Sequence, residues 1–219
     1  HEVLNKLLTS SGLPVLSEEA AGVSFEQRCQ WSSFWLIDPL DGTKEFIHRN
    51  GEFTVNVALI EAGIPKLGVV FAPASDELYA GIEGMGAWYL SNASSLNYLG
   101  FQDLISLNDF TQLEQPRSHH YTVAVSRSHA DEKTSRYLSS LESSKGTIRI
   151  LEAGSAMKLC LVAAGKADEY PRFGPTYEWD IAAGHAVLLG VNKDVISMED
   201  NLRLRYNKPN LINPAFIAK

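Results

Sequence analysis

Two aspartates separated by a proline and a leucine carry the clearest chemical signal in this sequence. Asp38 and Asp41 belong to the segment 38–42, Asp-Pro-Leu-Asp-Gly, which follows the apolar run 34–37. Proline stiffens the chain and glycine permits a sharp turn, so the two carboxylates could converge on one point. Mg²⁺ prefers such hard oxygens, and the Leu40 carbonyl could supply another. The pattern also fits a plain turn, in which aspartate accepts hydrogen bonds from nearby N–H groups.

Further carboxylates occur where other predicted elements begin or end. The glutamates at 18–19 follow the short strand predicted at 15–16, and Asp180 begins the helix predicted over 180–189. Taken alone, Asp180 fits the N-cap of that helix, a frequent role for aspartate. A rigid helix start is also a good place for a metal ligand. The occurrence of these residues together with the 38–42 turn favours a shared metal cluster over a plain turn.

The hydrophobic pattern predicts two successive kinds of architecture. Apolar and β-branched segments up to residue 90 predict an antiparallel sheet with a helix at its start, with the strand at 34–37 stopped by Pro39. Beyond residue 120 strands and helices alternate, which is typical of an α/β half. Residues 91–120 are predicted as a surface insertion or interdomain connection. We therefore expect a metal-binding α+β half at 1–118 and an α/β half at 119–219 that carries substrate contacts and one metal ligand.

The composition limits the class of protein. The chain has 219 residues, 45% of them hydrophobic and 21% charged, which is near the average for globular proteins. Its formal net charge of −7 argues against nucleic-acid polymers and anionic membranes as partners, because phosphate backbones are bound by basic stripes. The longest apolar stretch is shorter than the roughly 20 residues of a membrane-spanning helix. Two distant cysteines, Cys29 and Cys160, favour a reducing cytosol.

Several of these motifs together resemble a known superfamily. The segment 38–43, Asp-Pro-Leu-Asp-Gly-Thr, the upstream Glu-Glu and the segment 179–184, Trp-Asp-Ile-Ala-Ala-Gly, resemble the lithium-sensitive, magnesium-dependent phosphatases that include inositol monophosphatase. Other segments are similar to the bacterial 3′(2′),5′-bisphosphate nucleotidases of that superfamily: 36–47, 49–56, 126–129 and 170–176. The resemblance implies an α+β fold, the layered αβαβα sandwich, with the active site between the two halves. It also implies a cytoplasmic enzyme and leaves open a peripheral position on the cytoplasmic face of the inner membrane.

The resemblance implies site residues position by position. Two or three Mg²⁺ ions would be bound by the side chains of Glu18, Asp38, Asp41 and Asp180 and by the carbonyl of Leu40. The catalytic residues that it implies are Thr43, Asp41 and Glu18. The implied substrate contacts are Glu18, Leu40, Asp41, Gly42, Thr43, Ser126, His129, Ser155, Lys158 and Asp180. On its own, His129 fits a helix start or the core equally well.

The residue types at 154–158 agree with a phosphate contact on physical grounds. Ser155 is expected to open a helix whose free N–H groups suit a phosphate, and Lys158 adds a positive charge one turn later. In isolation, the serine fits a plain N-cap and the lysine a solvated surface residue. Arg127 and Arg172 are further candidates, since a guanidinium presents a planar fork to phosphate oxygens. Surface salt bridges explain these arginines equally well.

The activity that the resemblance implies is Mg²⁺-dependent hydrolysis of a small bisphosphate nucleotide. The substrate would be adenosine 3′,5′-bisphosphate, with AMP and phosphate as products, and hydrolysis of its sulfated relative PAPS stays open. Two alternatives remain: an inositol or sugar monophosphatase with the same metal core, and a catalytically silent nucleotide-binding protein. Family members carry an upstream Thr-Ala-Ala-Asp-like motif whose aspartate assists the threonine of the turn. The sequence begins downstream of it at His1, so we expect part of the metal-binding half to be missing and hydrolysis to be slow.

Overall fold

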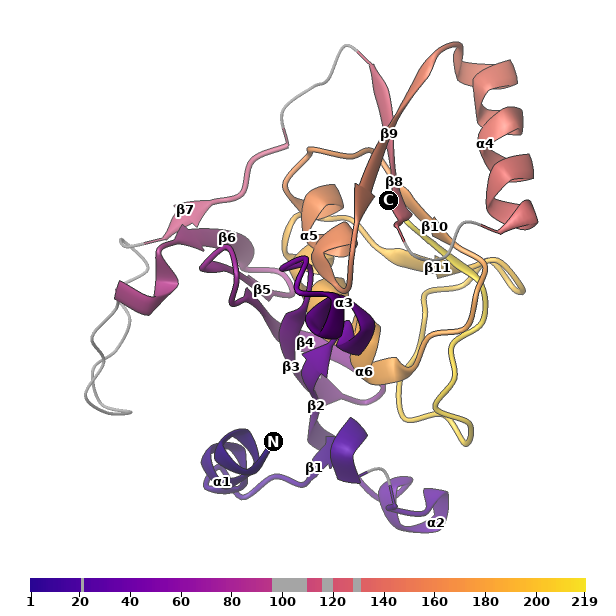
Figure 1. Cartoon of the computed structure of the whole chain (residues 1–219). Coiled ribbons are helices and arrows are strands. Elements are labelled where there is room, and N and C mark those ends of the chain that lie inside the picture. The colour runs from indigo at the N-terminus through magenta and orange to yellow at the C-terminus, as the bar shows by residue number, and fades with distance from the viewer. Residues whose placement is uncertain (21, 96–109, 116–119, 128–130) are drawn as a thin grey trace.

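The chain folds as a layered α+β sandwich in which helices lie between two layers of strands. A computed structural model describes residues 1–20, 22–95, 110–115, 120–127 and 131–219 (Figure 1). The short helical elements of the first half are α1 (Glu2–Thr9), η1 (Glu18–Ala20), α2 (Phe25–Arg28), α3 (Thr43–His48) and η2 (Ala93–Ser95). Among the described residues, none of the helices has the length and apolar character needed to span a bilayer.

Within the described residues, the large sheet has seven strands in the order of the sequence. They are β1 (Val15–Ser17), β2 (Ser33–Asp41), β3 (Thr54–Glu61), β4 (Ile64–Ala72), β5 (Glu77–Ile82), β6 (Gly86–Ser91) and β7 (Thr111–Gln112). All neighbours are antiparallel except β1 and β2, which are parallel. Alternate residues of β3 are buried, as the period of two in a strand requires. The antiparallel sheet predicted for the first half is therefore confirmed, apart from the β1–β2 pair.

Strand β2 continues through Pro39, where the sequence predicted its end. The pairing of β2 with β3 shifts in register between Asp38 and Asp41. Such an irregularity tolerates a proline, which has no N–H to donate to the hydrogen-bond ladder. The predicted stop was therefore wrong, and both aspartates lie on one strand. Gly42 follows directly with a φ of +88°, a left-handed conformation that glycine adopts without strain.

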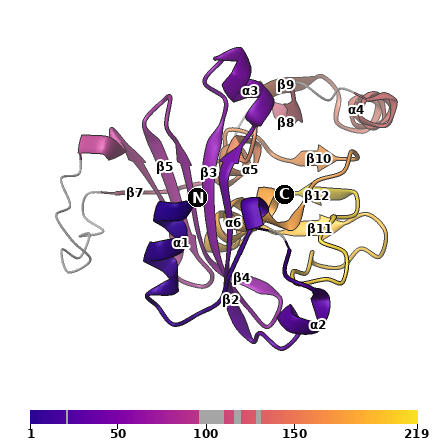
Figure 2. The same ribbon diagram turned by 60° about the horizontal axis from the view of Figure 1, so that its bottom comes forward.

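Two helices of the second half cover one face of the large sheet. They are α5 (Met157–Ala163) and α6 (Glu178–Gly190), and α6 contacts β3, β4, β5 and β6. Residues 181–189 of α6 are all buried, because the helix lies between the large sheet and the sheet of β10, β11 and β12 (Figure 2). This is the helix predicted at 180–189, and it begins two residues earlier.

A second layer of strands lies beyond these helices. Its members are the parallel pair β8 (Tyr121–Ser126) and β9 (Ile148–Ala153) and the antiparallel β10 (Tyr170–Arg172), β12 (Phe216–Ala218) and β11 (Val195–Ser197). Helix α4 (Glu132–Lys145) packs on this layer, with Leu138 and Leu141 against Val123, Val125 and Ile148. The strand and helix alternation predicted beyond residue 120 is confirmed. The predicted boundary at residue 118 lies outside the described residues and stays a prediction.

Two glycines allow α6 to lie directly on the large sheet. A Cβ atom built on Gly68 of β4 would lie 2.2 Å from the carbonyl oxygen of Ala183. On Gly81 of β5 it would lie 2.3 Å from the Cα of Val187. These distances are far inside van der Waals contact, so a side chain at either position would push the helix and the sheet apart.

We predict that Gly81→Ala lowers the free energy of unfolding by about 1–3 kcal/mol, because the added methyl group overpacks the contact with α6. Gly22→Ala is the matched control, since a Cβ atom there meets nothing within 4 Å. Urea unfolding followed by circular dichroism measures both variants. Equal stability of the two would contradict the close packing described above.

Candidate active site

Three aspartates from two elements meet where β2 ends. Asp38 and Asp41 lie on β2, and Asp180 lies in the first turn of α6. One carboxylate oxygen from each lies within 4.8 Å of the others. Asp38 is buried, whereas the other two are partly exposed. The structure thus brings together carboxylates that are far apart in the sequence.

The two aspartates of β2 are oriented by neighbouring donors. The backbone N–H of Leu40 donates to Asp38 Oδ1 at 2.9 Å. Thr54 Oγ1 and Asn56 Nδ2, from the adjacent strand β3, lie 3.4 and 3.3 Å from Asp41 Oδ2. These contacts position both carboxylates before any ligand binds.

Asp180 caps α6 from within the first turn rather than from the N-cap position. The helix begins at Glu178, and Asp180 Oδ2 accepts a hydrogen bond from the N–H of Tyr177 at 2.8 Å. The predicted N-cap role was therefore wrong in its position, because the helix starts earlier than predicted. The bond back to the N-cap residue fixes the direction of the carboxylate.

The second-half residues that support Asp180 were missed by the sequence analysis. Glu178 is fully buried and accepts hydrogen bonds from the N–H of Lys208 at 3.0 Å and from its Nζ at 2.7 Å. The same Nζ donates to Asn213 Oδ1 at 3.0 Å, and Asn213 Nδ2 donates to the carbonyl of Tyr177 at 2.8 Å. A glutamate in a first helical turn looks like an ordinary helix start, so no local signal reveals this buried network.

The electrostatics of the cluster favour a bound cation. Burial, with the charges of Asp41 and Glu18 nearby, raises the pKa of Asp38 to about 9. Burial and the Asp41 charge raise the pKa of Asp180 to about 7. Burial also raises the pKa of Asp41, while Lys158 acts in the opposite direction. Like charges this close need protons or a metal ion between them, and hard carboxylate oxygens fit Mg²⁺.

The other predicted metal and catalytic residues border the cluster. Glu18 lies in η1 and is exposed, and its charge acts on both Asp38 and Asp180. The Leu40 carbonyl lies 3.5 Å from the hydroxyl of Thr43, the first residue of α3. The structure therefore places the implied ligand and catalytic groups around the three aspartates.

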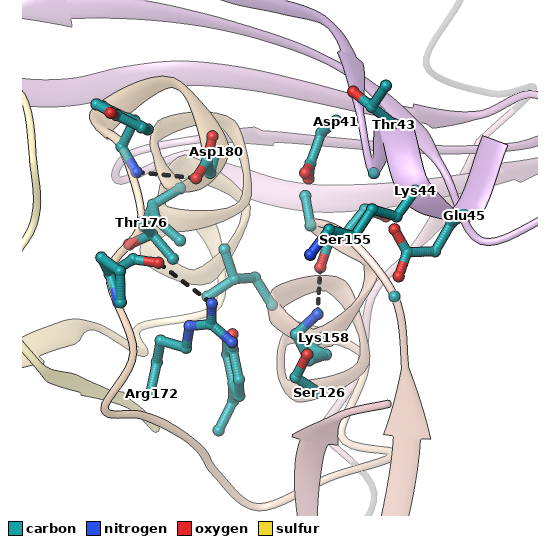
Figure 3. Close-up of a pocket in the computed structure, with 18 of the residues that line it drawn as sticks. Asp41, Thr43, Lys44, Glu45, Ser126, Ser155, Lys158, Arg172, Thr176 and Asp180 are labelled. Atoms are coloured by element: carbon teal, nitrogen blue, oxygen red, sulfur yellow. Dashed lines mark hydrogen bonds between the residues drawn. The ribbon is translucent and has the colours of Figure 1, made fainter. Parts of the chain in front are cut away.

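A pocket of about 450 Å³ opens beside the aspartates. Figure 3 shows Asp41 and Asp180 at one end and Lys158, Arg172 and Ser126 at the other. Lining residues that the sequence analysis did not single out include Glu45, Tyr170, Thr176, Tyr177 and Ile212. The pocket therefore has an acidic end and a basic end, and both halves of the chain contribute to it.

Lys158 is buried, with only 4% of its surface exposed. The interpretation as a solvated surface lysine is therefore wrong. Its Nζ donates to the carbonyl oxygens of Ala153 at 3.2 Å and Ser155 at 2.7 Å, and it lies 5.3 Å from the centre of the Tyr170 ring. Burial lowers its pKa to about 8, although the charge of Asp41 opposes the change. A buried ammonium group thus lines the basic end of the pocket.

Ser155 is not the N-cap that the sequence predicted. Helix α5 begins at Met157 with Ala156 as its N-cap, and Ser155 has a φ of +41°, which non-glycine residues rarely adopt. Its hydroxyl is buried and has no hydrogen-bond partner among the described residues. Leaving a buried polar group unpaired costs about 1–3 kcal/mol, so this hydroxyl in the pocket wall is suited to a ligand.

The two arginines that were candidates for a phosphate contact or a surface salt bridge have different surroundings. Arg172 lines the pocket and donates to two backbone carbonyl oxygens, each at 3.2 Å. Arg127 instead forms an ion pair with Glu52 at 2.8 Å and lies outside the pocket lining that the structure describes. His129 lies outside the described residues.

Comparison with known proteins agrees with the motifs and the fold. The sequence matches the inositol monophosphatase family over residues 2–217. The chain therefore belongs to the inositol monophosphatase family, which confirms the resemblance and the layered fold that it implied.

Relatives with 41% to 44% sequence identity to this chain include proteins named CysQ. The 3′(2′),5′-bisphosphate nucleotidase CysQ of Shigella flexneri is 44% identical over 204 residues, which are 93% of this chain and 74% of that protein. The structure also matches the crystal structure of CysQ from Bacteroides thetaiotaomicron, with a TM-score of 0.90 and 41% sequence identity. The match covers all of this chain and 81% of the CysQ chain. An IMPase/NADP phosphatase complexed with Mg²⁺ and phosphate shares the fold, with a TM-score of 0.73 at 18% identity over all of this chain and 73% of its own.

Without metal ions, the aspartate cluster should make the fold less stable as the pH rises. The folded state holds the Asp38 proton up to a pKa of about 9, whereas its ordinary pKa is 3.8. Between these values the folded state binds more protons than the unfolded chain, so the free energy of unfolding falls with rising pH. We expect the melting temperature in EDTA to fall from about pH 5 to about pH 8.5, and Mg²⁺ to stabilise most at the higher pH.

Asp38→Asn should reduce both effects, because the variant has no proton to exchange for a metal ion at this position. Glu132→Gln is the control, since it removes an exposed carboxylate outside the cluster. Differential scanning fluorimetry gives the comparison, and the same pH profile for Asp38→Asn and wild type would show that the cluster is not the cause.

Proposed function

We propose that this chain is a Mg²⁺-dependent phosphatase that removes the 3′-phosphate of adenosine 3′,5′-bisphosphate to give AMP and phosphate. One observation carries the proposal: a single pocket has carboxylates at one end and Lys158 and Arg172 at the other. A bisphosphate has two anionic groups, one suited to metal ions and one to cationic side chains. Relatives at 43–44% identity are named 3′(2′),5′-bisphosphate nucleotidases, which supports the same substrate class.

In this proposal, two or three Mg²⁺ ions are held by Asp38, Asp41 and Asp180, with the Leu40 carbonyl and Glu18 completing the ligand set. Bound Mg²⁺ supplies charge that stabilises the phosphoryl oxygens and lowers the pKa of the attacking water. The geometry supports this assignment, because the aspartates are hard donors within 4.8 Å of one another and their raised pKa values indicate a demand for positive charge.

The protein's own groups position the reacting atoms. The Thr43 hydroxyl orients the water that attacks the phosphorus atom, and Asp41 and Glu18 are the carboxylates available to accept its proton. The bond between phosphorus and the 3′-oxygen then breaks, and the 3′-oxygen takes up a proton and leaves as a hydroxyl of AMP. Gly42 supports this arrangement because its left-handed conformation sets the turn between Asp41 and Thr43.

The basic end of the pocket binds the second phosphate. Lys158 and Arg172 supply positive charge, and the Ser155 hydroxyl gains the hydrogen-bond partner that it lacks. Ser126 lines the same end of the pocket. His129 is proposed as a further nucleotide contact from the family resemblance. Together these groups would make the enzyme prefer bisphosphates to monophosphates as substrates.

Phosphate release with Mg²⁺ tests the substrate class. We expect kcat/KM to be higher for adenosine 3′,5′-bisphosphate than for adenosine 3′-monophosphate or inositol 1-phosphate, because only the bisphosphate uses both ends of the pocket. Equal or faster hydrolysis of inositol 1-phosphate would favour an inositol or sugar monophosphatase. Nucleotide binding without release of phosphate from any substrate would favour a silent binding protein.

Arg172→Ala should lower kcat/KM for the bisphosphate by about 10- to 100-fold, mainly through KM, because it removes one partner of a charge-assisted hydrogen bond. The effect on adenosine 3′-monophosphate, which lacks the second phosphate, should be much smaller. Arg127→Ala is the matched control, since this arginine pairs with Glu52 outside the pocket lining. A loss of similar size with both substrates would contradict the assignment of Arg172 to the second phosphate.

A further inference from the structure

The lining of the pocket includes an exposed aromatic residue and an exposed aliphatic residue that the proposed phosphate contacts do not use. Tyr177 and Ile212 line the pocket and are 45% and 39% exposed. The Tyr177 ring stacks on that of Trp179, with ring centres 4.8 Å apart and planes 10° apart. Trp179 is buried, with 5% of its surface exposed. One face of the tyrosine is therefore covered by tryptophan, and the exposed area belongs to its edges and its other face.

The backbone holds this tyrosine in place. Its N–H donates to Asp180 at 2.8 Å, and its carbonyl accepts from Asn213 Nδ2 at 2.8 Å. Tyr177 also pairs with Ile212 in an isolated antiparallel bridge. With its backbone held in this way and its ring stacked on Trp179, the side chain loses little conformational freedom when a ligand packs on it, which favours binding. The same residue that orients a carboxylate of the cluster thus presents a rigid aromatic surface to the pocket.

We propose that Tyr177 is a specificity-determining residue whose exposed ring face stacks on the nucleobase of the substrate, with Ile212 at its edge. The inference rests on the proposed function and deepens it, because the two phosphates use the charged ends and the base is the part that remains. A flat base presents the apolar face that suits an aromatic ring. Stacking of this kind tolerates every base, so Tyr177 distinguishes nucleotides from base-free sugar bisphosphates.

The experiment compares adenosine 3′,5′-bisphosphate with ribose 3,5-bisphosphate, which lacks the base. In Tyr177→Leu, which keeps an apolar side chain without an aromatic face, the preference in kcat/KM for the nucleotide should fall about tenfold, through KM. Tyr177→Phe, which keeps the aromatic ring, should retain the wild-type preference for the nucleotide. Both variants keep the backbone N–H that bonds Asp180, so kcat with the base-free substrate reports whether the metal end is intact.

Leu202→Ala is the control, because this residue is 64% exposed and does not line the pocket as described. Ile212→Ala gives a second, independent variant, and we expect a decrease of several-fold in the same preference. An unchanged preference in Tyr177→Leu and Ile212→Ala would overturn the proposal.

Binding of AMP separates the failure of this inference from the failure of the proposed function. Isothermal titration calorimetry in Mg²⁺ needs no turnover, and Tyr177→Leu should raise the Kd of AMP about tenfold relative to wild type. Equal affinity in both proteins would overturn the aromatic contact even if the bisphosphate is hydrolysed. A wild-type protein that binds AMP through Tyr177 but releases no phosphate would instead overturn the phosphatase assignment and support this inference.

Discussion

The close contact between α6 and the large sheet is the constraint on which the active site depends. Asp180 belongs to the helix, and Asp38 and Asp41 belong to the sheet, so their separation is set by how near the two elements pack. Gly68 and Gly81 permit backbone contact that any side chain would prevent. One carboxylate oxygen of each of the three aspartates lies within 4.8 Å of the others, and the close packing of α6 on the sheet brings Asp180 to the aspartates of β2.

This packing forces like charges together, and the protein compensates locally rather than by separating them. Asp180 lies in the first turn of α6, where the helix dipole favours a negative charge and the Tyr177 N–H is available. The buried pair of Glu178 and Lys208, at 2.7 Å, ties the same turn to the C-terminal segment. These contacts position the carboxylates of the cluster although like charges repel, and this combination is typical of a site prepared for a cation.

The same local compensation explains how an acidic protein can bind an anion. The net charge of −7 describes the whole chain, but the pocket has its own field, with Lys158 and Arg172 facing the basic end. Lys158 is held by backbone carbonyl oxygens, so its positive charge is not cancelled by a carboxylate partner in these contacts. Charge at a site is thus decided by a few buried groups, whereas net charge governs long-range attraction.

The sequence by itself identified the candidate residues for metal ions and phosphate, because that signal is local. The 38–42 turn, the Glu-Glu pair and the segment after Trp179 each carry their chemistry within a few residues, and the strand periodicity of the first half is equally local. Tertiary structure decided where Pro39 stands in its strand, where α6 begins, and that Lys158 is buried. It also placed Tyr177 in the pocket. These features depend on the register shift of β2 against β3, on the C-terminal segment and on packing between layers. Contacts between distant segments leave no pattern in a short stretch of sequence.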